Sequence, residues 1–501
     1  MIAAVVLLIF LLPLLFVLLK KSSFRCSNLP PGPNAWQVWS NISEIGKQPH
    51  VAFKNLSALY GPLLSFRLGT QLVVVASSPE TAEKILKTHD RICSGRYMPL
   101  AFYEIPRVMN SSLTMSKECN ETWKLLRGIT HNTLFSSRAV DLRCEIRSQK
   151  VAEMMRYLLH KQGQVVNMDN VVKITVSNII SGVLATRNLF NVRGLDVGDK
   201  EDQRVKGLLD EIVVKAAVPG FGDLFPLLKR VDFCSKRNGI DLYRKSISVW
   251  EEIIKERRNL RNGNDNHGVS WGQSFIDVLI ENSFLDDEIG ILLTELLIAG
   301  TDSTIITIIW LVVELLKNQE ILSRVRDEIA ATIEGSSIVE SRLSECQYFQ
   351  ACMKETLRLH IPGPFLVPHR SIRDCNVNNY DIPKDTMILV NAWAIQVDSN
   401  NWEDASVFKP ERFLESKIDF KGSHFEFIPF SAGQRMCPGF NMGFRNIQLI
   451  VACLVHHFDW SLPDCGDPKS LDTGERFGTT LKRDQTLHLI PRVRSEQYVV
   501  G

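Results

Sequence analysis

One segment restricts the possible folds of this chain more than any other. Residues 286–318 carry the apolar spacing of an α-helix over 33 consecutive positions. The segment opens with Asp286, Asp287 and Glu288, and acidic side chains suit the amino terminus of a helix. At roughly 1.5 Å per residue the helix would be about 50 Å long, enough to cross a whole domain. Its middle is almost uncharged on every side, so we expect the other elements to pack around it.

Two residues of this predicted helix do not fit an apolar core. Gly300 costs about 0.5 to 1 kcal/mol relative to alanine inside a helix. Asp302 is an acid at a place where burial disfavours charge. Another part of the molecule must compensate for both.

The rest of the chain predicts a mainly α fold, one large helical domain with small β-sheets. Most of residues 45–360 has helical spacing, interrupted by short β-type runs at 63–66 and 72–75 around Gly69. The polar stretch 256–268 is expected to be a solvated loop. The formal net charge is only +2, which gives no support for a nucleic-acid partner.

The amino-terminal segment predicts a membrane anchor. Residues 2–19 are uncharged over eighteen positions, close to the length that spans a bilayer. Lys20, Lys21 and Arg25 follow, which places the body on the cytoplasmic side. A cleaved signal peptide is the alternative, but the basic start and the cleavage site are both missing. We therefore divide the chain into an anchor (1–20), a proline-rich hinge (21–40) and a catalytic domain (41–501).

Two features bear on the compartment. The eleven cysteines are scattered and odd in number, which indicates reducing surroundings. A cytoplasmic body should also carry no glycan on its sequons, which lie at Asn41, Asn55, Asn110 and Asn120.

Residues 430–439, FSAGQRMCPG, place Cys437 between a glycine-containing loop and a predicted helix. Backbone N–H groups and the positive end of that helix would point at the sulfur and favour its thiolate form. Glycines would let a flat macrocycle approach the backbone. Such a cysteine can serve as an axial thiolate ligand of heme iron; an isolated cysteine would more often be buried and structural.

This block resembles the heme-binding signature of the cytochrome P-450 heme-thiolate monooxygenases, and further motifs agree in order and spacing. Residues 299–304 resemble the oxygen-activating stretch of the family's long central helix. Residues 354–358 resemble its E-x-x-R motif, 410–413 its P-E-R-F motif and 123–127 its W-x-x-x-R motif. The chain departs from the usual residues at Ser303 (Thr in the family) and at Ser431 and Gln434 (Gly and Arg in many plant members).

The resemblance assigns roles in proton delivery. Asp302 would shuttle protons to bound oxygen, and the hydroxyls of Ser303 and Thr304 would hold the water that receives them. Loss of the threonine methyl at Ser303 makes its rotamer less restricted and the coupling of electrons to product looser. The alternative is that these hydroxyls bond back to helix carbonyls.

The resemblance also implies a heme b site with Cys437 as the metal ligand. The implied cofactor-binding set is Arg96, Trp123, Arg127, His369, Phe430, Arg435 and Gly439, with arginines, Trp123 and His369 on the propionates. Glu355 and Arg358 lie three apart and share a helix face. With Arg412 they would form a buried structural triad; a surface ion pair is the alternative.

Substrate and partner predictions complete the interpretation. The substrate wall would include Leu296, Ala299, Gly300, Phe365, Leu366, Val367 and Phe477, with the loop 97–115. No G-x-G-x-x-G unit and no P-loop is present, so electrons must come from a partner. The resemblance implies that this partner is an NADPH–cytochrome reductase. It would dock near Lys124, Arg127, Arg138, Arg143 and Arg445, unless these form only a solvated helix face.

The sequence is most similar to plant microsomal members acting on terpenoids and alkaloids. We therefore expect a single-pass protein of the endoplasmic reticulum that uses O₂ to hydroxylate a small lipophilic plant metabolite. Oxidative coupling, ring formation or rearrangement of an alkaloid is an alternative on the same fold. A heme-binding protein without turnover is an alternative of another class.

Overall fold

The computed structural model describes residues 28–494, apart from 41, 98, 100–110, 192–204, 206, 210, 212–231, 263–273, 334–337 and 464–465. The predicted anchor 1–20, the first part of the hinge and most of the loop 97–115 therefore lie outside the described residues. The described part of the hinge contains a short helix, α2 (Ala35–Ser40).

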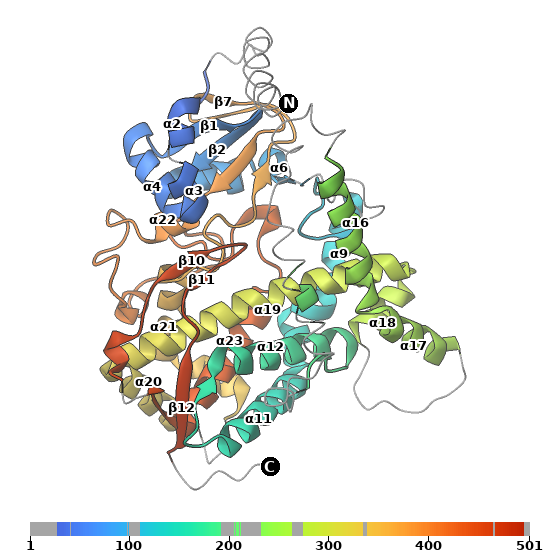
Figure 1. Ribbon diagram of the computed structural model, residues 1–501, viewed down its shortest axis with the longest axis vertical. Coiled ribbons are helices and arrows are strands. Elements are labelled where there is room, and N and C mark those ends of the chain that lie inside the picture. Colours follow the sequence, from blue (N-terminus) through green and yellow to red (C-terminus); the bar gives the residue numbers. More distant parts are fainter. Residues whose placement is uncertain are drawn as a thin grey trace, which may run out of the picture.

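The long central helix is confirmed: α19 spans Asp286–Lys317, 32 residues, and crosses the helical part of the molecule (Figure 1). At its start the backbone N–H of Leu285 donates to Glu288 Oε2 at 3.0 Å. By length and composition α19 could span a membrane, yet 67% of its most apolar window is buried inside the protein. It is therefore the core helix that the uncharged middle predicts.

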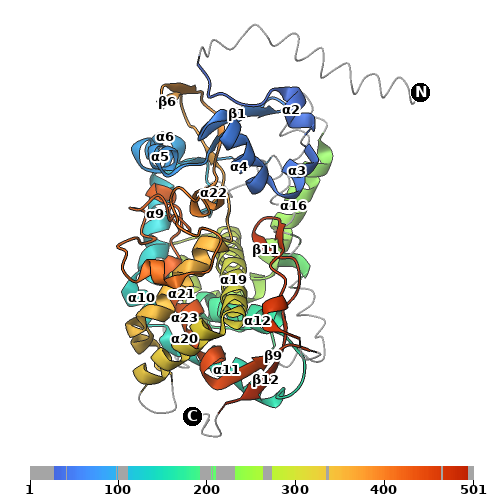
Figure 2. The same ribbon diagram turned by 90° about the vertical axis from the view of Figure 1, so that its left-hand side faces the viewer.

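Helices surround α19 on several sides (Figure 2). Its neighbours are α12 (Met168–Ala185), α16 (Phe233–Ser248), α20 (Gln319–Thr332), α21 (Gln347–Leu359) and α23 (Phe440–His457). Further helices are α9 (Glu121–Thr130), α10 (Ser137–Asp141), α11 (Cys144–His160), α17 (Glu251–Asn262) and α18 (Phe275–Glu281). One large apolar cluster, formed mainly by α11, α12, α19 and α23, is the main core.

The prediction of a solvated loop over residues 256–268 is wrong for its first half, because helix α17 continues to Asn262. Contacts distant in sequence hold this polar segment in the helix. Arg258 Nε donates to Asp286 Oδ1 at 2.6 Å, and Arg257 bonds the hydroxyl of Thr186. Tertiary ion pairs therefore override the local composition.

The predicted β-type runs form β1 (Leu63–Leu68) and β2 (Gln71–Ala76), an antiparallel pair with Leu63 opposite Ala76. They belong to a five-stranded sheet of order β1-β2-β8-β5-β3, with β8 at Met387–Val390, β5 at His369–Arg370 and β3 at Gly95–Arg96. The β3–β5 pairing places Arg96 opposite His369. This sheet thus brings two predicted site residues together from positions far apart in the chain.

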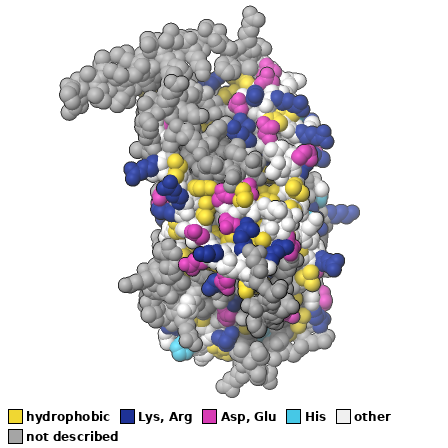
Figure 3. Space-filling model, turned by 90° about the vertical axis from the view of Figure 1, so that its right-hand side faces the viewer, with side chains coloured by type: hydrophobic (Ala, Val, Ile, Leu, Met, Phe, Trp, Pro, Cys, Tyr) yellow, Lys and Arg dark blue, Asp and Glu magenta, His cyan; other side chains and the backbone are white. Residues whose placement is uncertain are grey.

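Smaller elements complete the fold. Three small sheets are β4–β12–β9 (Val166–Asn167, His488–Val493, Phe458–Ser461), β6–β7 (Cys375–Val377, Tyr380–Ile382) and β10–β11 (Glu475–Phe477, Leu481–Arg483). Short helices near the five-stranded sheet are α3 (Ile42–Lys47), α4 (Pro49–Tyr60), α5 (Pro79–Glu83), α6 (Asp90–Cys93) and α22 (Ala392–Gln396). On the face shown in Figure 3, basic and acidic side chains are interspersed, as the balanced charge predicts.

Candidate active site

The loop around Cys437 is built mainly from backbone contacts. Its N–H donates to the carbonyl of Phe430 at 2.9 Å, and α23 begins three residues later, at Phe440. The N–H groups of Gly439 and Phe440 donate to the sulfur. Nη2 of Arg127 donates to the carbonyl of Met436 at 2.5 Å. The sulfur thus sits at the amino end of a helix, as the sequence predicts.

The predicted preference for the thiolate needs a correction. Burial has the largest effect and raises the pKa of the Cys437 thiol, whereas the N–H donors and Arg127 lower it only in part. The protein groups alone therefore leave the thiol form favoured at neutral pH. A bound metal ion supplies the remaining stabilisation of a thiolate, because a coordinating thiol is deprotonated outright.

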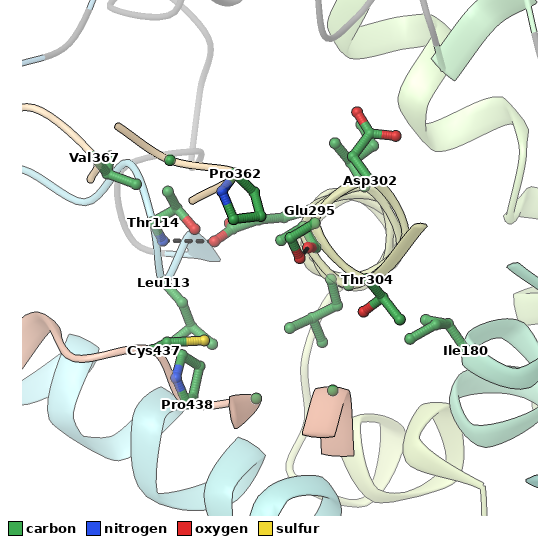
Figure 4. Close-up of a pocket in the computed structure, with 18 of the residues that line it drawn as sticks. Leu113, Thr114, Ile180, Glu295, Asp302, Thr304, Pro362, Val367, Cys437 and Pro438 are labelled. Carbon is green, nitrogen blue, oxygen red and sulfur yellow. Dashed lines mark hydrogen bonds between the residues drawn. The ribbon is translucent and has the colours of Figure 1, made fainter. Parts of the chain in front are cut away.

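Cys437 lies at one end of a cavity of about 530 Å³ (Figure 4). α19, α12 and α23 contribute to its wall, together with residues 112–115 and the segment 362–367. Of the predicted substrate residues, the wall includes Leu296, Ala299, Gly300, Leu366 and Val367. The lining is mostly apolar, as expected for a small lipophilic ligand.

The structure does not place Phe365 and Phe477 on this wall. Phe365 is 8% exposed and packs against Phe53 and Phe477 with ring centroids 5.6 Å and 6.0 Å apart. The turn after Phe477 contributes Thr479 and Thr480 to the cavity instead. Two large aromatic rings at the predicted positions thus complete a neighbouring core.

A set of buried donors lies on another side of the cavity. Arg435 donates from Nε to Ser94 O at 2.9 Å and from Nη1 to Leu113 O at 2.8 Å. Nη1 of Arg96 donates to Val367 O at 2.6 Å, and burial lowers the pKa of Arg96 to about 9. Within the described residues neither guanidinium forms an ion pair. This side therefore has positive charge without an anionic partner.

Two aromatic donors belong to the same set. The indole N–H of Trp123 donates to Leu113 O at 2.9 Å, and the Arg435 guanidinium lies 4.7 Å from the centroid of its ring. Nδ1 of His369 donates to Cys93 O at 2.8 Å, while its Nε2 is buried and has no partner among the residues that the structure describes. Burial, Arg96 and Arg435 hold the pKa of His369 well below its usual range. An anion beside Nε2 would supply the missing partner and favour a second proton on the ring.

Three of the predicted docking residues, Arg127, Lys124 and Arg445, contact other groups of the protein itself. Arg127 is directed at the Cys437 loop rather than outward, through its bond to Met436. Lys124 pairs with Glu121 at 2.8 Å, and Arg445 lies 3.8 Å from Asp141. Such local pairs are also typical of a solvated helix face, so reductase docking here stays a prediction.

The structure brings the predicted triad together. Arg358 and Glu355 form two hydrogen bonds of 2.8 Å, with both side chains fully buried. Arg412 Nε donates to Glu355 Oε1 at 3.1 Å. Nη1 of Arg358 also donates to the carbonyl oxygens of Gln396 and Ala405, both at 2.8 Å. This satisfied network ties α21 to the segment that leads to the Cys437 loop.

The middle of α19 differs in detail from the prediction. The hydroxyl of Ser303 donates to Ala299 O at 2.9 Å, which is the back-bonded alternative. Asp302 and Thr304 both line the cavity. A Cβ at Gly300 would lie 2.8 Å from the side chain of Ile180. The close approach at this glycine is therefore to α12, which explains why the helix has no larger residue here.

Two cavity residues were missed by the sequence analysis. Glu295 accepts a hydrogen bond from the N–H of Thr114 at 2.5 Å. It lies seven residues before Asp302, two turns along the same helix, and this spacing could have revealed it. Asn446 on α23 is 1% exposed, and neither its amide nitrogen nor its amide oxygen has a partner. No motif signals Asn446.

Residues 30–488 of the chain match the model of the protein family described as Cytochrome P450. The chain belongs to the cytochrome P450 family. It is 39% identical over 482 residues to the probable (S)-N-methylcoclaurine 3'-hydroxylase isozyme 2 of Coptis japonica, covering 96% of each chain. It is 33% identical over 500 residues to geraniol 8-hydroxylase of Catharanthus roseus, covering 96% of this chain and 98% of that one.

The fold comparison agrees. A zebra fish cytochrome P450 structure with progesterone superposes with a TM-score of 0.72 at 24% identity, covering 89% of this P450 and 99% of that chain. The predicted fold class is therefore confirmed. The P450 is a monooxygenase with heme b, and electrons from NADPH reach it through a reductase, as is standard in the family.

The residues of this P450 fit the heme. Cys437, which lines the cavity at one end, would hold the heme iron through its sulfur. The unpaired positive charge of Arg96 and Arg435, the indole N–H of Trp123 and the orphaned Nε2 of His369 suit propionates. Phe430 and Gly439 line the cavity next to the sulfur. When bound, a thiolate-ligated heme activates O₂ for oxygen insertion.

Residues of the chain itself bind the substrate, exclude water and transfer protons. The apolar wall holds a lipophilic substrate and excludes water. The carboxyl of Asp302 can take up and release protons at the cavity edge, which is general acid–base work. Asp302, Ser303 and Thr304 are the polar groups of this stretch on the cavity wall, and the hydroxyl hydrogen of Ser303 is donated to Ala299 O.

Proposed function

We propose that this P450 hydroxylates a small lipophilic alkaloid or terpenoid, with O₂ and with electrons from an NADPH–cytochrome reductase. The observation that carries the proposal is the mostly apolar cavity that runs from Asp302 and Ala299 on α19 to the sulfur of Cys437. Relatives named as hydroxylases, including an N-methylcoclaurine 3'-hydroxylase and a geraniol 8-hydroxylase, support this reaction class and these substrates.

A turnover assay tests this proposal. Microsomes containing the full chain and a plant reductase are supplied with NADPH and either (S)-N-methylcoclaurine, as an alkaloid, or geraniol, as a terpenoid. We expect one substrate class to give a product heavier by one oxygen atom that derives from ¹⁸O₂. NADPH oxidation that no substrate stimulates would instead favour a heme-binding protein without turnover.

Oxidative coupling or ring formation is a second candidate, and one observation favours it. The Ser303 hydroxyl, which lies on the cavity wall, donates its hydrogen to Ala299 O at 2.9 Å, so this hydrogen is not available to a water on the path to bound oxygen. A relative named corytuberine synthase, from Coptis japonica, is 37% identical over 488 residues. A product that has lost two hydrogens and contains no ¹⁸O would identify this reaction.

The membrane arrangement is part of the proposal. Residues 1–20 would form a single-pass anchor in the endoplasmic reticulum, with the catalytic domain in the cytoplasm and the reductase docked near Lys124 and Arg138. This topology predicts that the sequons, Asn120 among them, carry no glycan. Glycosidase treatment should leave the electrophoretic mobility of the expressed chain unchanged.

A further inference from the structure

Glu295 is a carboxylate inside the substrate cavity that none of the recognised motifs includes. Its Oε1 accepts from the backbone N–H of Thr114 at 2.5 Å, between residues 181 positions apart (Figure 4). The backbone N–H of Leu113 and the hydroxyls of Ser112 and Thr114 also donate to it. Burial has the larger effect and raises the pKa of Glu295. One side chain of the central helix thus binds three successive loop residues.

The opposite edge of this loop is bound from another direction. We call residues 112–116 the roof loop. Its Leu113 carbonyl accepts from Trp123 Nε1 at 2.9 Å and from Arg435 Nη1 at 2.8 Å, and its Ser116 carbonyl accepts from Arg435 Nη2 at 2.5 Å. The roof loop is therefore held between two groups of residues. Its N–H edge is bound to α19 and its C=O edge to donors of the heme-binding set.

Four of the roof loop residues, 112–115, line the cavity. In Figure 4 the side chain of Leu113 points toward the Cys437 end of the cavity, and Thr114 faces Glu295. A small displacement of this loop would change the space next to the reacting centre. Donors of the heme-binding set can bind propionates in place of carbonyl oxygens, whereas the N–H groups of Leu113 and Thr114 depend on Glu295.

We propose that Glu295 is a positioning residue for substrate specificity: by holding the N–H edge of the roof loop on α19, it fixes how far Leu113 and Thr114 reach over the substrate. The effect on substrate rests on the proposed function. The loop attachment itself does not, and it can be tested without turnover.

The first experiment measures hydrogen exchange by mass spectrometry on the full-length heme-loaded protein in detergent. The variants are Glu295→Ala, Glu295→Gln and the control Glu288→Ala, whose carboxylate accepts the N–H of Leu285 at 3.0 Å at the exposed start of α19. We expect Glu295→Ala to accelerate exchange of the amides of 113 and 114 about tenfold or more. Glu295→Gln keeps an acceptor oxygen, so it should restore protection to within about threefold of wild type.

The second experiment uses two heme ligands of different size, imidazole and 4-phenylimidazole, titrated by absorbance. Imidazole lacks a substituent that could contact the roof loop. We expect Glu295→Ala to change the affinity for 4-phenylimidazole about fivefold or more, which corresponds to about 1 kcal/mol of binding free energy. The affinity for imidazole should remain unchanged. With a substrate from the turnover assay, the same variant should alter the product distribution and raise KM more than it lowers kcat.

Three results would overturn the proposal. Equal changes for both ligands would show a general loss of structure. Unchanged exchange at 113 and 114 would show that Glu295 does not hold the loop. Normal exchange in Glu295→Gln together with weaker binding of n-octylamine, but not of n-octanol, would show that the carboxylate is a counter-ion for an amine. Failure of turnover with all substrates, combined with the expected exchange pattern, would refute the proposed function and leave the loop attachment standing.

Discussion

The two sides of the cavity are built in different ways. On the cysteine side, two central contacts join residues close in sequence: Cys437 N–H bonds to Phe430 O, and Glu355 bonds to Arg358 three positions away, while Arg127 reaches Met436 across 309 positions. On the substrate side, Glu295 holds Thr114 across 181 positions. Local contacts produce short motifs, whereas the substrate wall depends on the fold to bring separate segments together. Because the cysteine side includes the fully buried ion pair of Glu355 and Arg358, substitutions there should lower stability more than substitutions on the substrate side.

The largest effect is expected from a substitution that disrupts the buried contacts of the cysteine side. Arg358→Ala leaves the fully buried carboxylate of Glu355 without its main partner, which costs about 3 to 5 kcal/mol. We expect almost no heme-loaded protein, measured as CO-binding pigment per unit of expressed chain. Arg187→Ala is the control, because its pair with Glu256 at 3.0 Å is more than half exposed and should matter by less than about 1 kcal/mol. Equal losses in the two variants would contradict the structural role of the triad.

A change on the substrate side should affect chemistry and leave the fold intact. Asp302→Asn removes the proton-carrying group, and we expect product formation to fall about 100-fold. The CO spectrum should remain normal, and NADPH oxidation should continue with release of hydrogen peroxide. Product formation at the wild-type rate would show that another group delivers the protons.

The β10–β11 hairpin, which brings Thr479 and Thr480 to the cavity, offers a pH-dependent test. His360 bonds Glu314 at 2.9 Å and Glu475 at 3.2 Å. Burial lowers the pKa of His360, but the two carboxylates outweigh it and the net pKa is raised above 6.5. The charged histidine therefore stabilises the fold below about pH 6.5, and this stabilisation is lost as the pH rises through the raised pKa.

His360→Gln should accordingly lower the free energy of unfolding by about 1 to 3 kcal/mol at pH 6. The difference from wild type should shrink at pH 9. Urea unfolding of both proteins across this pH range measures it. A difference that grows with pH would reverse the sign and contradict the charged state of His360.

The smallest expected effect lies on the cysteine side. Ser431 has φ +64°, a left-handed conformation that favours glycine, and its hydroxyl is buried without a partner in the described part of the chain. Ser431→Gly should raise the free energy of unfolding by about 1 kcal/mol and leave the CO spectrum unchanged. A loss of stability would show that the hydroxyl has a function in the loop.

The same division explains what could be predicted. The helix 286–318, the strands around Gly69 and the position of Cys437 follow from local spacing, and the structure has them within a few residues. The continuation of α17 to Asn262 depends on ion pairs with distant residues and could not be read locally. Glu295 and the packing of Phe365 also depend on tertiary contacts. The pKa of Cys437 was misjudged because helix-end effects are visible in sequence and depth of burial is not.

The CO difference spectrum of the reduced protein tests the central claim most directly. Cys453, on α23, provides the control, because it is buried and its burial raises the pKa of its thiol to about 12. Wild type and Cys453→Ala should both show the red-shifted band of a thiolate-ligated heme, and Cys437→Ala should lose it. A red-shifted band that persists in Cys437→Ala, or a wild-type protein whose iron is held by nitrogen, would contradict the assignment of Cys437.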